Sequence, residues 1–183
     1  MDRHAWDTLT PDLVGAGFHV VSFDLRGFGD TPGSSRSADE SKIAGDADAA
    51  YAYLISRRDV DRLRVAAGGA SCGVMYSSAL ASRHPEVKAL LLLSGLAGAN
   101  GQAHIAATRS LAVFGAAADG SGSDAADTRQ AVAASRHPQS TMRIIRGGGH
   151  GVSMFESDGA LKGTMVKWLE ARFSNNSQPT SPE

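Results

Sequence analysis

Short runs of apolar and β-branched residues recur along the chain, and most of them end in Gly, Asp or Ser. Strands that are buried on both faces of a parallel sheet have this near-continuous apolar character. Polar loops or segments of helical periodicity separate the runs, so each run is interpreted as one strand. The five predicted strands cover residues 18–24, 63–68, 87–94, 110–116 and 141–146.

Helical spacing of apolar residues is clearest at the end of the chain, from about residue 158 to 173, and residues 37–57 share it. We interpret the apolar residues of this last segment as one face of a helix that packs against a sheet. Its members are Leu161, Met165, Trp168, Leu169 and Phe173.

Strands that alternate with helices predict an α/β fold, a doubly wound and mostly parallel sheet of about five strands. We expect one domain over residues 1–173. The remaining residues, 174–183, are polar and contain proline, which predicts a disordered tail.

Composition narrows the functional classes. The 183 residues are 42% hydrophobic and 20% charged, as is usual for a globular protein that buries a sizeable core. A net charge of -1 supplies no basic surface for nucleic acid, and no apolar run approaches the roughly 20 residues that span a bilayer. The start of the chain lacks the pattern of a signal peptide, so we expect a cytoplasmic protein with no nucleic-acid or membrane partner. The oligomeric state stays open.

The sequence Gly69-Ala70-Ser71-Cys72-Gly73 stands where a predicted strand gives way to a predicted helix. A serine hydroxyl becomes an effective nucleophile when it projects from a tight strand-to-helix turn, where a base can reach it. We expect Gly69 and Gly73 to omit Cβ atoms that would collide where strand and helix pack. The chain has 21 glycines, so a simple glycine-rich turn is the competing interpretation.

Two further candidates follow predicted strands, and ligands of such sheets bind beyond the carboxyl ends of the strands. Asp119 follows the fourth predicted strand, and His150 lies among glycines after the fifth. With Ser71 they give the chain order Ser, Asp, His, in which the histidine takes the hydroxyl proton and the aspartate orients the imidazole. Asp124 and Asp127 remain alternatives for the acid, and Asp119 is favoured because it follows the strand most closely.

Three segments together resemble the α/β-hydrolase superfamily: residues 18–29, the elbow around Ser71, and residues 148–154. The chain is most similar to compact, capless members such as dienelactone hydrolases and small esterases. Residues 96–109 are too few for a cap domain. The resemblance implies cleavage of a carboxylic ester or lactone through an acyl-enzyme on Ser71, with no cofactor. It also implies that the backbone N–H of Cys72 is an oxyanion donor.

The resemblance has one departure, at the amino-terminal end. Family members have earlier strands, and the central one ends in a loop that supplies a second oxyanion N–H. By resemblance, residues 18–24 correspond to the strand outside that central one, so we expect a sheet that lacks a strand near its middle. Loss of one oxyanion donor costs about 100- to 1,000-fold in turnover.

Two alternatives to the serine hydrolase follow. In the first, the domain is catalytically silent and acts as a binding or vestigial module. In the second, the domain is an enzyme whose nucleophile is Cys72. A metal enzyme is disfavoured because no His, Cys or carboxylate group has ligand spacing. A nucleotide-binding protein is disfavoured because no phosphate-binding glycine loop follows a strand.

Overall fold

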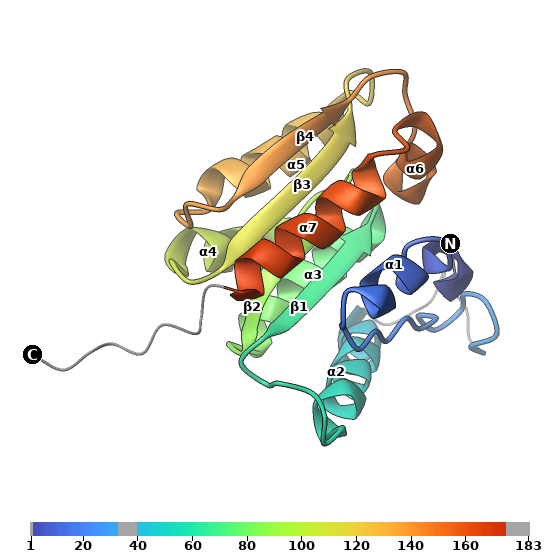
Figure 1. Cartoon of the computed structure of the whole chain (residues 1–183), viewed down its shortest axis with the longest axis vertical. Helices are drawn as coiled ribbons and strands as arrows, with labels where there is room; N and C mark the ends of the chain where they lie inside the picture. Colours follow the sequence, from blue (N-terminus) through green and yellow to red (C-terminus); the bar gives the residue numbers. More distant parts are fainter. Residues whose placement is uncertain (1, 33–39, 175–183) are drawn as a thin grey trace, which may run out of the picture.

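Four parallel strands form the centre of the computed structural model, which describes residues 2–32 and 40–174 (Figure 1). They stand in the order β1-β2-β3-β4. Four of the predicted strands are thereby confirmed, with ends that differ from the predicted ones by at most two residues. The strands are β1 (Val65–Ala70), β2 (Val87–Leu93), β3 (Ala112–Ala118) and β4 (Thr141–Ile145).

Helices connect successive strands and cover both faces of the sheet, as the α/β prediction requires (Figure 1). The connecting helices α3 (Cys72–Arg83), α4 (Gly98–Ala107) and α5 (Ser123–Ala134) lie on one face, and α7 (Leu161–Ser174) crosses the other. No helix in the described ranges is long and apolar enough to cross a membrane. The remaining elements are η1 (Arg3–Trp6), α1 (Thr10–Gly15), α2 (Glu40–Ser56), η2 (Gly151–Ser153) and α6 (Met154–Ser157).

The alternation of side chains along β2 divides the core into two layers. Leu91 and Leu93 belong to the cluster on the α7 side, while Leu90 and Leu92 belong to the cluster under α3, α4 and α5. All seven residues of β3 are buried. The stripe predicted on the last helix packs in the first cluster, with Leu161, Met165, Leu169 and Phe173 buried and Trp168 partly buried against it.

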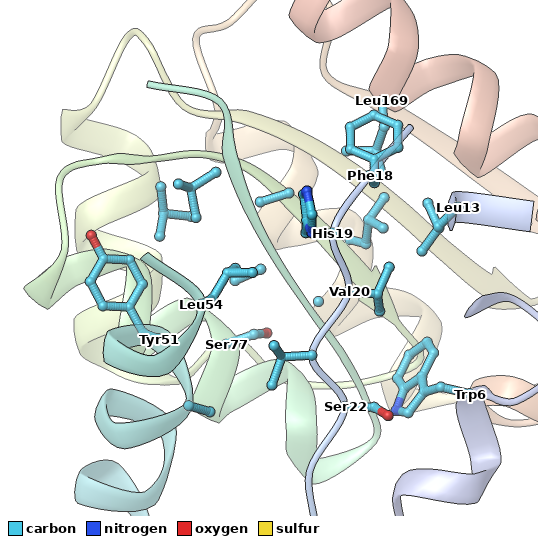
Figure 2. Close-up of a pocket in the computed structure, with 18 of the residues that line it drawn as sticks. Trp6, Leu13, Phe18, His19, Val20, Ser22, Tyr51, Leu54, Ser77 and Leu169 are labelled. Carbon is cyan, nitrogen blue, oxygen red and sulfur yellow. The ribbon is translucent and has the colours of Figure 1, made fainter. Parts of the chain in front are cut away.

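Residues 18–24 do not form the predicted first strand. They are extended and run beside the outer edge of β1, but no backbone hydrogen bonds join the two among the described residues. A cavity of about 630 Å³ separates them, lined by Trp6, Phe18, Val20, Tyr51 and Gly68 among others (Figure 2). The sheet therefore has four strands instead of about five, because a strand needs a hydrogen-bonding neighbour.

Asp24 and Arg26, which follow this segment, have structural roles. The buried carboxylate of Asp24 accepts hydrogen bonds from the backbone N–H groups of Arg3, at 2.6 Å, and Asp30, at 3.1 Å, and it pairs with the Arg3 guanidinium. The bond from the Arg3 N–H holds the pKa of Asp24 below its ordinary value of 3.8. Arg26 binds Asp46 of α2 through Nε at 2.8 Å. These contacts fix the turn against its neighbours.

Residues 33–39 and 175–183 lie outside the described part of the chain. They include the start of the helix predicted over residues 37–57 and nearly all of the predicted tail. The remainder of that helix is α2.

Candidate active site

The turn between β1 and α3 has the strained backbone that a nucleophile elbow requires. Ser71 stands between the last residue of β1 and the first of α3 with φ 55° and ψ -124°. A non-glycine residue in such a sparsely populated region costs about 1–3 kcal/mol, and it persists only where neighbouring contacts enforce it. Here the Ser71 N–H donates to Leu93 O at 2.9 Å, and the Val74 N–H donates to Ser71 O at 3.0 Å. Both backbone groups of Ser71 are therefore held in place.

The two elbow glycines have different roles. A Cβ atom on Gly69 would lie 2.0 Å from the carbonyl oxygen of Gly73, so the crossing of strand and helix excludes any side chain at Gly69. A Cβ atom on Gly73 would meet nothing within 4 Å. The expected steric reason therefore holds for Gly69 and is wrong for Gly73.

The loop after β2 packs directly against the elbow. A Cβ atom on Gly95 would lie 2.4 Å from Ser71 O. The preceding residue, Ser94, is fully buried with φ 52°, and its N–H donates to Ala116 O of β3 at 2.9 Å. The sequence shows these two residues only as the end of a strand, and nothing in the pattern distinguishes them as part of the site.

His150 is held on a glycine loop after β4. Gly147, Gly148 and Gly149 all have φ between 94° and 99°, values that side chains rarely adopt. The His150 N–H donates to Ser153 Oγ at 2.8 Å, and that hydroxyl donates to His150 O at 3.0 Å. This reciprocal pair fixes the backbone of His150 while the ring stays 46% exposed.

The partner of His150 is Asp124. His150 Nδ1 lies 3.0 Å from Asp124 Oδ2. Asp119, which the sequence favours as the acid, is exposed just past β3, and its carboxylate has no partner in the described part of the chain. The chain turns between them, with Gly122 at φ 58°, so the first turn of α5 carries the carboxylate that reaches the ring. The structure thus favours Asp124, the alternative that the sequence leaves open, over Asp119.

Ser71, Asp124 and His150 follow β1, β3 and β4, so all three lie at the carboxyl edge of one parallel sheet. The Asp124–His150 pair is assembled. Within residues 2–32 and 40–174, no hydrogen bond joins the Ser71 hydroxyl to the ring. Catalytic hydrogen bonds are often long or poorly aligned before substrate binds, so the roles of the three residues stay predictions.

The N–H group of Cys72 is available to a ligand beside Ser71. Cys72 is the first residue of α3 and is exposed. The first four N–H groups of an α-helix have no acceptor inside the helix, so the Cys72 N–H can donate to an anionic oxygen. The described residues contain no group of three or more His, Cys, Asp or Glu side chains that could hold a metal ion.

Comparison with known proteins agrees with the fold. Residues 3–143 match the sequence model of the family described as serine aminopeptidase, S33. Two uncharacterized proteins of Mycobacterium tuberculosis, from strains CDC 1551 / Oshkosh and ATCC 25618 / H37Rv, are each 37% identical over 90 residues. Each match covers 49% of this chain and 31% of the relative, so the chain matches about a third of their length.

One solved structure has the same fold over nearly the whole chain. It is the crystal structure of a predicted CIB-like hydrolase from Thermoplasma acidophilum, with a TM-score of 0.71 and 16% sequence identity. The superposition covers 93% of this chain and 82% of that one. With the family match, the four parallel strands with helices on both faces are an α/β-hydrolase fold.

Proposed function

Because the chain belongs to the serine aminopeptidase S33 family of α/β hydrolases, we propose that it cleaves a carboxylic ester or lactone through an acyl-enzyme on Ser71. The observation that carries this proposal is the contact between His150 Nδ1 and Asp124 Oδ2, 3.0 Å apart, at the sheet edge where Ser71 stands in a strained turn. A nucleophile, a base and an orienting acid at one edge are the parts that acyl transfer needs.

In the proposed reaction, His150 takes the proton of the Ser71 hydroxyl as Oγ attacks the carbonyl carbon of the substrate. Asp124 holds Nδ1 of the ring protonated, which leaves Nε2 free to accept that proton, and it stabilises the imidazolium. The N–H of Cys72 donates to the oxyanion. The imidazolium then protonates the departing alkoxide, and water hydrolyses the acyl-enzyme with His150 again as base.

An open site supports small ester substrates. The connection between β2 and β3 consists of α4 and short loops, and it places no additional domain over Ser71. Leu96 lies three residues after the end of β2 and directly follows Gly95, which packs against the elbow, and it is 54% exposed. An apolar side chain beside the site favours an uncharged acyl group. The family description names an aminopeptidase, so an aminoacyl amide is the second substrate class to assay.

Hydrolysis of p-nitrophenyl acetate by the purified chain tests this proposal, with p-nitroanilides of alanine and leucine as the amide alternatives. We expect the ester to be cleaved and Asp124→Asn to lower kcat by about 10⁴-fold, because the amide disfavours the required imidazole tautomer. Asp119→Asn is the matched control and should retain nearly all activity. Loss of activity in Asp119→Asn with no effect of Asp124→Asn would contradict the assignment of Asp124 as the acid. Cleavage of the anilides but not of the ester would show that the substrate is an amide.

A further inference from the structure

One buried hydroxyl joins two of the loops that carry the candidate site. Thr128 lies on α5, one turn after Asp124, and is fully buried. Its Oγ1 accepts a hydrogen bond from the Gly95 N–H at 3.1 Å and donates to the carbonyl oxygen of Asp124 at 2.8 Å. The carbonyl of Gly95, at 3.3 Å, is a second acceptor for the same hydrogen. The hydroxyl therefore links the end of β2 to the first turn of α5.

On the β2 side, the link leads to the nucleophile. Gly95 lies so close to the elbow that a Cβ atom there would stand 2.4 Å from Ser71 O and 3.0 Å from Val74 Cβ. Ser71 O also accepts the N–H of Val74, which fixes the first turn of α3. A shift of Gly95 would consequently press on the backbone that sets the strained conformation of Ser71.

On the α5 side, the link leads to the acid. Asp124 has a side chain 36% exposed, and its carboxylate contacts His150. Two hydrogen bonds fix the backbone of Asp124. The Thr128 hydroxyl donates to its carbonyl oxygen, and its N–H donates to the carbonyl oxygen of Ser121 at 3.2 Å. The Thr128 methyl group meanwhile packs on β3, where a Cβ atom on Gly115 would lie 2.9 Å from it.

We propose that Thr128 is a positioning residue whose hydroxyl sets the Asp124–His150 pair relative to Ser71. The proposal rests on the function proposed above for these three residues. Thr128 lies in the core and reaches the substrate only through Gly95 and Asp124. If Thr128 merely filled the core, its methyl group would matter and its hydroxyl would not. Valine and serine at this position separate the two possibilities, because each removes one of the two groups.

The test is the second-order rate of covalent labelling of Ser71 by a fluorophosphonate, in full-length variants at a temperature where circular dichroism shows each to be folded. Thr128→Val keeps the shape but leaves the buried Gly95 N–H without its acceptor, and we expect labelling to slow by roughly 10- to 100-fold. Thr128→Ser keeps the hydroxyl and should retain most of the wild-type rate. Ala131→Gly, at a fully buried position of the same helix, controls for loss of stability alone.

Any of three results would overturn the proposal. Thr128→Val could label at the wild-type rate, or the labelling of Thr128→Ser or of Ala131→Gly could slow as much as that of Thr128→Val. If Thr128→Val does not fold, Thr128→Ser and Thr128→Ala differ by a single oxygen and make the same comparison. Failure of the folded wild type to label at Ser71 is a different result. It overturns the proposed function, and the positioning role with it.

Discussion

Replacing Ser71 with alanine is expected to remove ester hydrolysis, lowering kcat by at least about 1,000-fold and leaving the protein folded. The reason is that Ser71 supplies the oxygen that attacks the carbonyl, and no other hydroxyl occupies the strained turn between β1 and α3. Alanine adds no atoms and keeps the backbone, so the hydrogen bond from the N–H of this position to Leu93 O and the one from the Val74 N–H to its carbonyl both remain. Initial rates with p-nitrophenyl acetate, compared with the buffer rate, measure the effect.

Cys72→Ala is the matched variant, because Cys72 is the neighbouring exposed residue and carries the alternative nucleophile. In our account Cys72 contributes a backbone N–H, which alanine retains, so most of the activity should remain. The opposite result, with activity that survives Ser71→Ala and is lost with Cys72→Ala or with a thiol reagent, would identify the cysteine as nucleophile.

Adding one methyl group at Gly69 is expected to destabilise the protein by about 3–5 kcal/mol, a large part of the usual total of 5–15 kcal/mol. The new Cβ atom would stand 2.0 Å from the carbonyl oxygen of Gly73, and neither the strand nor the helix backbone can yield cheaply. The free energy of unfolding in urea, followed by the fluorescence of Trp6 and Trp168, measures this loss.

Gly73→Ala provides the control within the same five residues. Its Cβ atom would project into open space near the start of α3, where alanine favours the helix by up to about 1 kcal/mol over glycine. We expect unchanged or slightly raised stability. Equal losses at Gly69 and Gly73 would show that the close crossing of β1 and α3 does not constrain the elbow.

The central strands could be predicted from the sequence because their signal is local. A strand buried on both faces is apolar at nearly every position, as in the run from Val87 to Leu93, and the buried strands β2 and β3 show it most clearly. Residues 18–24 have a similar composition and are extended, yet they form no strand. Strand formation depends on a hydrogen-bonding neighbour, which composition does not encode.

The candidate site was predictable to the level of individual loops. Glycines mark both residues in the sequence: Gly69 leaves room for the close crossing of β1 and α3 beside Ser71, and the glycines before His150 adopt positive φ. The choice between Asp119 and Asp124 depends on how the chain turns at Gly122, which places the first turn of α5 against the His150 loop. Thr128 has no local signature, since its role arises from contacts with Gly95, 33 residues away.

The measurement that tests the central claim most directly is fluorophosphonate labelling of the purified chain, with the modified residue located by peptide mass spectrometry. Our account predicts one label on Ser71 in the wild type, and none in His150→Ala when that variant is folded, because the hydroxyl then has no base. Absence of label on folded wild-type protein, or label on Ser71 that persists without His150, would contradict a Ser71–His150–Asp124 site and favour a catalytically silent α/β-hydrolase domain.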